Sequence, residues 1–112
     1  MIDGYDFGEI TIDGRTYHHD VIIYKDSVDD TWRRMEGHNL ALGDIVQIID
    51  KKPEILIIGT GADGVMRVPA DVVASIEAKG IKAIVKKTGD ACDDYNSLAS
   101  SGNVIAALHL TC

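Results

Sequence analysis

The sequence predicts an α/β fold: a single three-layer domain with a central mixed, mostly parallel sheet, an N-terminal β-hairpin and about three helices. Three observations carry this prediction. The second half alternates apolar and amphipathic stretches in the order β-α-β-α-β, which favours parallel strands joined by helices. The run "EILIIG" at 54–59 is apolar without interruption, as in a strand covered on both faces. In the first 24 residues, Asp13-Gly14 separates two stretches that are expected to be strands, and this dipeptide is typical of tight hairpin turns.

The first 39 residues are expected to form a hairpin followed by a loop. In residues 1–24, Ile10 and Ile12 alternate with polar neighbours, and a return strand is predicted from Thr16 to Tyr24. Residues 25–39, "KDSVDDTWRRMEGHN", show no periodicity. They are interpreted as a long surface loop.

Residues 40–112 are expected to form a helix followed by the βαβαβ unit. The first helix is predicted from the apolar spacing of Leu42, Ile45, Val46 and Ile49. A second helix should open at Pro69 and end before Gly80. "IKAIVK" at 81–86 is predicted as a strand, Asp90 as the cap of a third helix ending near Gly102, and "NVIAALHLT" as the last strand.

Composition limits the classes of partner. The chain has 112 residues, 46% of them hydrophobic, and a net charge of −7, which suits one domain with a real core. Negative charge repels nucleic-acid backbones and anionic lipids, so neither is an expected partner. Acidic residues concentrate in 1–31 and are interpreted as a solvated face.

The cysteines and the hydropathy suggest a cytoplasmic protein. Cys92 and Cys112 are far apart, which fits neither a disulfide framework nor a zinc motif. The N-terminal residues do not resemble a secretory signal. No apolar stretch approaches the ~18 residues that cross a bilayer.

The segment "GTGADG" at 59–64 matches the G-x-G-x-x-G pattern of dinucleotide-binding loops. In such loops the helix begins within the glycines, so that its amides face the pyrophosphate. Here β-branched Val65 and Val68 follow, and Val68 precedes Pro69, which favours extended backbone. Lys86-Lys87 stands where a ribose-binding acid is expected. The sequence therefore predicts an extended path to Pro69 and no cofactor.

The same sheet edge still offers a candidate pocket. Ligands bind open α/β sheets at the carboxyl ends of the strands, where the 59–64 loop and the 88–96 segment should meet. The candidate residues here are Thr60, Gly61, Thr88, Tyr95 and Asn96. Alternatively, Thr88 and Asp90 only cap a helix and Tyr95 packs in the core.

Other candidate constellations give weaker signals. His18 and His19 point to opposite faces of a strand, and His38 and His109 lack ligand spacing, so no metal site is predicted. Cys92 lies in the first turn of a predicted helix, where the dipole lowers a thiol pKa. A semi-buried structural role for Cys92 is the alternative.

Trp32-Arg33-Arg34 is an aromatic and basic cluster within an acidic stretch. This composition resembles that of interface hot spots. Alternatively, Trp32 attaches the loop to the body of the domain while the arginines pair with nearby acids. No Ser-His-acid constellation can be assembled from the sequence.

Several motifs together resemble a known family. They are "DVIIY" followed by "WRRMEGH", "KPEILIIGTGADG", "VP" before a helix, and "TGDACDDYNSL" followed by "VIAALHLTC". They are similar to small α/β domains of unknown function from archaea and bacteria, related to a mitochondrial complex I assembly factor and an adipogenesis-associated protein. The resemblance implies a three-layer fold without established enzymatic activity. Its recurring polar residues fall on Arg33, Arg34, His38, Thr60, Gly61, Thr88, Tyr95 and Asn96.

Two functional hypotheses are consistent with these observations. The first is a non-enzymatic protein-interaction or assembly-assisting module, or a homo-oligomer, that uses Trp32, Arg33, Arg34 and His38. The second is a small-anion-binding protein or weak enzyme. Its pocket would lie between the 59–64 loop and the 88–96 helix start, with Arg33 or Arg34 as the anion clamp.

Overall fold

A five-stranded mixed sheet forms the centre of the molecule. The computed structural model describes residues 1–112, and the strand order is β5-β4-β8-β6-β7. The strands are β4 (Val21–Ile23), β5 (Val28–Asp29), β6 (Ile55–Thr60), β7 (Lys82–Lys86) and β8 (Val104–His109). Strand β6 runs parallel to β7 and β8, whereas β4 is antiparallel to β8 and β5. The predicted mixed, mostly parallel sheet is confirmed.

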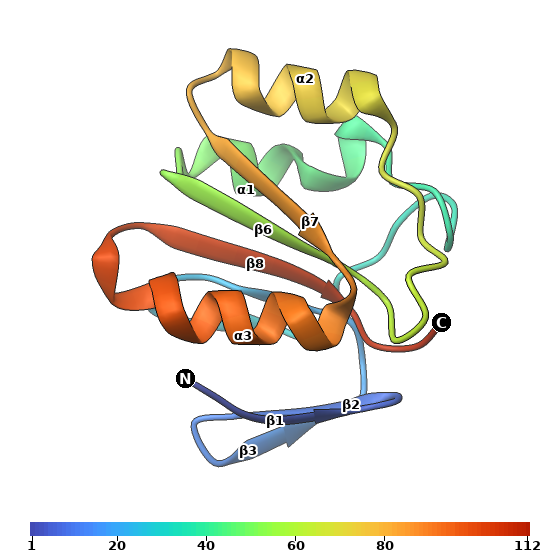
Figure 1. Ribbon diagram of the computed structural model, residues 1–112, viewed down its shortest axis with the longest axis vertical. Coiled ribbons are helices and arrows are strands. Elements are labelled where there is room, and N and C mark those ends of the chain that lie inside the picture. The colour runs from blue at the N-terminus through green and yellow to red at the C-terminus, as the bar shows by residue number, and fades with distance from the viewer.

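Helices cover both faces of this sheet (Figure 1). One face carries the 3₁₀ turn η1 (Leu42–Ile45), α1 (Val46–Asp50) and α2 (Ala70–Ala78). The other carries α3 (Thr88–Leu98), which continues into η2 (Ala99–Ser101). A small antiparallel sheet of β1 (Ile2–Asp6), β2 (Glu9–Ile12) and β3 (Arg15–Tyr17) lies beside α3. None of the helices has the length and apolar character that crossing a membrane requires.

The central strands supply two separate hydrophobic clusters. In β6, Leu56 and Ile58 pack under α1 and α2, while Ile57 packs under α3. Strand β8 alternates in the same way: Ile105 belongs to the cluster under α1 and α2, and Leu108 belongs to the cluster under α3. Since successive side chains of a strand point to opposite faces, a strand buried on both faces must be apolar throughout. The uninterrupted runs of the sequence are explained by this arrangement.

The N-terminal half differs from the predicted hairpin. The turn at Asp13-Gly14 is present, with positive φ at both residues, but the expected return strand from Thr16 to Tyr24 is two strands in two sheets. The prediction also missed β1, which pairs with β2 across a turn at Gly8. The polar residues His18, His19 and Asp20 separate β3 from β4, and the chain changes sheets there.

The predicted amphipathic helix has a different inner face. Ile45 and Ile48 are fully buried, whereas Leu42 and Val46 remain 37% and 49% exposed. The reason is that the segment starts as a 3₁₀ turn, whose three residues per turn rotate the side chains away from the α-helical pattern.

The later helices fit the prediction more closely. Helix α2 follows Pro69 and ends before Gly80, whose φ is +80°. Helix α3 starts at Thr88, so Asp90 is not its cap but lies in its first turn. An acidic residue is favourable there because the N-terminal end of a helix is electropositive.

Candidate functional site

The loop between β5 and η1 is held by two side chains that turn inward. Trp32 is only 2% exposed, and its indole Nε1 donates a hydrogen bond to the Asp44 carbonyl oxygen at 3.1 Å. The Arg34 side chain is 5% exposed, and its guanidinium carbon lies 4.6 Å from the centre of the Trp32 ring. Such contacts between a cation and an aromatic face are favourable. Trp32 therefore supports the loop from inside and does not belong to an exposed surface.

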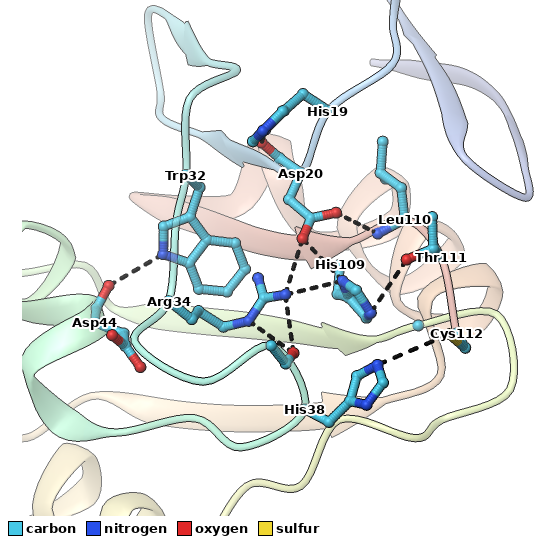
Figure 2. Close-up of polar contacts among 12 residues, drawn as sticks. His19, Asp20, Trp32, Arg34, His38, Asp44, His109, Leu110, Thr111 and Cys112 are labelled. Atoms are coloured by element: carbon cyan, nitrogen blue, oxygen red, sulfur yellow. Dashed lines mark hydrogen bonds and ion pairs between the residues drawn. The ribbon is translucent and has the colours of Figure 1, made fainter.

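Asp20 lies at the centre of a buried ion-pair network (Figure 2). Its Oδ2 forms an ion pair with Arg34 Nη2 at 2.9 Å and is hydrogen-bonded to His109 Nδ1 at 2.8 Å. Its Oδ1 accepts a hydrogen bond from the Leu110 amide at 2.8 Å. The carboxylate thus connects the loop to the end of the central strand β8.

Arg34 Nη2 makes further contacts in this network. It donates a hydrogen bond to the Gly37 carbonyl oxygen at 3.1 Å, and it lies 3.0 Å from His109 Nδ1. The other ring nitrogen of His109, Nε2, lies 3.5 Å from the Thr111 hydroxyl. Arg34 Nη1 is buried without a hydrogen-bond partner.

The same contacts alter the acidity of Asp20. Burial alone would raise its pKa, but the hydrogen bonds from His109, the Leu110 amide and Arg34 together lower it. Because His109 is only 5% exposed, its ring is shielded from solvent. The network is therefore an anchor for the loop and offers no accessible base for a bulky substrate.

His38 and Cys112 lie at the rim of this network. The Cys112 Sγ is 3.8 Å from His38 Nε2, and the His38 ring meets the His109 ring edge-on. His18 and His19 are exposed on the surface. No three His, Cys, Asp or Glu side chains are placed to hold a metal ion.

The glycine-rich loop follows the predicted extended path. After Gly64 the chain forms no helix until Ala70, which confirms the expectation drawn from Val65, Val68 and Pro69. The loop amides bind other parts of the same chain. The Gly61 amide donates to Thr88 Oγ1, the Ala62 amide to the Thr111 carbonyl oxygen and the Val65 amide to the Cys112 carbonyl oxygen.

The glycines allow close packing. A Cβ atom on Gly59 would lie 2.8 Å from Thr88 Oγ1, and one on Gly61 would lie 2.5 Å from the Cys112 backbone. Both distances are shorter than real Cβ contacts. The motif therefore lets the 111–112 segment and the start of α3 lie directly on the end of β6.

The structure does not gather the candidate pocket residues into one cavity. Thr60 donates to the Lys86 carbonyl oxygen, and Thr88 is fully buried, where it donates to the His109 carbonyl oxygen. Tyr95 packs in the core beneath the small sheet. Asn96 exchanges two hydrogen bonds with the Ile2 backbone, as a neighbouring strand would.

A cavity of about 310 Å³ does lie between the glycine-rich loop and the start of α3. Its walls are Ala62, Lys87, Gly89 and Asp90 together with the hairpin residues 5–7. Arg34 is bound to Asp20 and does not line this cavity, and neither does the exposed Arg33. Lys87 is the only basic residue of this cavity, and the carboxylates of Asp6 and Asp90 would repel an anion bound beside it.

Cys92 is buried in α3, and this burial raises the pKa of its thiol to about 12, with a further contribution from Asp93. The reactive-thiol interpretation is therefore replaced by the structural one. We expect the folded protein to react with iodoacetamide at half-exposed Cys112 and not at Cys92 at about pH 8. Mass spectrometry of labelled peptides measures this, with urea-unfolded protein as the control. Equal labelling of both thiols in the folded protein would contradict the assignment.

Two members of the network, Asp20 and His109, were not singled out together from the sequence. His109 interrupts the apolar run of β8, whereas Asp20 follows two histidines and precedes the apolar strand β4. A polar residue inside a buried strand must find a partner, because its desolvation is otherwise uncompensated. That signal marks His109 as partnered, although it does not identify the partner, and no such signal marks Asp20.

Residues 2–109 match a family described as proteins of unknown function, DUF498/DUF598. The chain belongs to this family. Solved structures support the assignment. A conserved hypothetical protein, PH1505 from Pyrococcus horikoshii, is 24% identical, with a TM-score of 0.86 over 100% of this chain and 99% of its own. The protein MT938 is 30% identical, with a TM-score of 0.81 over 100% and 98% of the two chains.

A third similar structure is that of an outer membrane protein from Bartonella henselae. It is 25% identical, with a TM-score of 0.81 over 98% of this chain and 93% of its own. These matches confirm the expected family of unknown function in archaea and bacteria and its α/β fold.

Proposed function

We propose that this member of the DUF498/DUF598 family is a non-enzymatic protein-interaction module that binds its partner through the 33–38 loop. The observation that carries the proposal is the contrast in solvent exposure among the side chains of residues 32–35. Trp32 and the Arg34 side chain are buried, whereas the adjacent Met35 is 91% exposed. A large apolar side chain in water is unfavourable, so its presentation on an anchored loop favours a role in binding.

The loop is preorganised by Asp44 as well as by the buried anchors. The Asp44 carboxylate accepts hydrogen bonds from the Met35 amide at 3.1 Å and from the Ala41 amide at 2.9 Å. The Asp44 carbonyl oxygen accepts the Trp32 indole. A loop fixed in this way loses little conformational entropy when a partner binds.

Charge indicates the chemistry of the partner. Arg33 and Arg67 are exposed and form no salt bridge, although the chain has a net charge of −7. The Arg67 amide donates to the His38 carbonyl oxygen, so the two segments are adjacent. We define Arg33, Met35, His38 and Arg67 as the loop surface. The partner that would complement the loop surface is a protein with an apolar pocket for Met35 and carboxylates at the rim of that pocket.

The cellular role proposed with this surface is assistance in assembling a larger complex in the cytoplasm. The sequence motifs resemble a family related to a mitochondrial complex I assembly factor, and this relationship favours the proposal, as does the absence of a solvent-accessible catalytic constellation around Asp20 and His109. Self-association through the same surface is a special case, in which the partner is a second copy.

The double variant Met35→Ser/Arg33→Ser tests the proposal. We expect it to weaken partner binding about thirtyfold, because truncating a hot spot costs at least ~2 kcal/mol. Affinity isolation followed by measurement of the dissociation constant, together with sedimentation velocity, gives the readout. Phe7→Ser is the matched control, since Phe7 is 58% exposed in the turn between β1 and β2. The proposal fails if the wild type is a monomer that captures no partner. It also fails if the double variant binds as the control does.

A further inference from the structure

A second cavity lies at the sheet edge opposite the glycine-rich loop, where β6 and β8 begin. Its volume is about 480 Å³, and its walls are Tyr24, Lys25, Ser27, Lys51 and Asn103 around a floor formed by Ile105. A volume in this range suits a small organic molecule. The cavity is separate from the loop surface, so a ligand bound in it would neither require nor exclude the proposed protein interaction.

Backbone contacts fix the walls of this cavity. The Tyr24 amide donates to the Ser27 carbonyl oxygen at 2.8 Å and closes the turn between β4 and β5. On the other side, the side-chain Nδ2 of Asn103 donates to the backbone carbonyl oxygens of Lys51 and Lys52 at 3.3 and 3.5 Å. The two lysine-bearing segments are therefore held in place without a ligand.

Both lysines of the cavity are unpaired. Neither Lys25 nor Lys51 has a carboxylate within 4.0 Å, although acidic residues outnumber basic ones in the chain. The Lys51 Nζ lies 5.9 Å from the centre of the Tyr24 ring, a cation–π contact that positions the ammonium group. Asp26 is the only acid in the lining.

The cavity also presents neutral donors. Tyr24 and Ser27 are among its lining residues, and neither side-chain hydroxyl is hydrogen-bonded to another protein atom. Burial, with a contribution from Asp29, raises the pKa of Tyr24, so its hydroxyl keeps its proton and remains a donor. Two cations and two hydroxyl donors thus surround a partly apolar floor.

We propose that this cavity binds the phosphate monoester of a small organic molecule. The ammonium groups of Lys25 and Lys51 compensate the dianion, and the two hydroxyls donate to its oxygens. The Tyr24 ring and Ile105 contact the organic part. Lysine binds phosphate as a point charge, and two ammonium groups balance the double negative charge of a phosphate monoester, whereas a carboxylate carries a single charge. A phosphate monoester is therefore the better match to this lining.

The test is a titration of the ¹⁵N-labelled full chain with phenyl phosphate, followed by NMR at constant ionic strength. We expect amide shifts that cluster at residues 24–27, 51 and 103, with a dissociation constant of about 1 mM or lower. Lys25→Gln and Lys51→Gln should each weaken binding about tenfold. Asp26→Asn should tighten binding, because it removes the only negative charge of the lining. Lys82→Gln, which removes an exposed lysine of β7, is the matched control and should bind as the wild type does.

Four outcomes would overturn the proposal. The first is no shift at these residues up to about 20 mM phenyl phosphate, far above the expected constant. The second is equal weakening by Lys82→Gln, which would indicate nonspecific attraction. The third is benzoate binding as tightly as phenyl phosphate, which would make the site one for carboxylates. The fourth is inorganic phosphate binding as tightly, which would leave no role for the organic part.

Discussion

Asp20→Asn is expected to lower the free energy of unfolding by about 3 kcal/mol, the cost typical of removing one partner from a buried ion pair. The Arg34 side chain is 5% exposed and would lose its only carboxylate. His109 would lose the carboxylate oxygen that lies 2.8 Å from its Nδ1. Urea unfolding followed by the fluorescence of Trp32, the only tryptophan, measures the change.

Two further variants separate the ion pair from general effects. Asp30→Asn removes the same charge at an exposed position outside the network and should leave stability within about 0.5 kcal/mol. Asp20→Asn/Arg34→Met removes both charges and should be less destabilised than the sum of the single variants, since no buried charge is left unpaired. Additive behaviour would show that the two side chains do not interact.

The same pair predicts a pH dependence with a definite sign. The folded-state pKa of Asp20 lies below the ordinary value of 3.8. Its stabilising contribution is therefore complete above that value and is lost as the pH falls through the lower, folded-state pKa. The stability difference between wild type and Asp20→Asn should shrink in that window and be constant above it. A difference that grew on acidification would contradict the assignment.

Those parts of the fold that depend on local pattern could be predicted from the sequence. Strands β6 and β8 are apolar throughout because both faces are covered, and the path from Gly64 to Pro69 follows from β-branching and the proline. The element after residue 40 was harder to predict, because a 3₁₀ start changes which apolar residues face inward.

The candidate site depends on contacts that no local pattern contains. Asp20 and His109 are neighbours because β4 pairs with β8, and Arg34 reaches them from the loop after β5. Burial of Trp32 likewise depends on the position of Asp44 on a different element. A loop tryptophan beside arginines fits both an exposed hot spot and a buried anchor, and only the packing of η1 decides between them.

The second large effect is expected at the glycine-rich loop. Gly61 has a φ of +106°, a conformation that costs residues with a Cβ about 1–2 kcal/mol. A Cβ there would also lie 2.5 Å from the Cys112 backbone and 2.7 Å from the Thr111 carbonyl oxygen. Overpacking against atoms that cannot rotate away adds about 1–3 kcal/mol. Gly61→Ala should therefore lower the free energy of unfolding by about 3 kcal/mol or more.

Gly89→Ala supplies the matched control for this prediction. Gly89 lies in α3, and a Cβ there meets no atom within 4 Å. Alanine is the better helix former, so this variant should be neutral or more stable by up to about 1 kcal/mol. Opposite signs for the same chemical change would show that the glycines of 59–64 are needed for packing within the chain. If Gly61→Ala were as stable as the wild type, the 111–112 segment would not lie on the loop as described, and the loop amides would be free for a ligand.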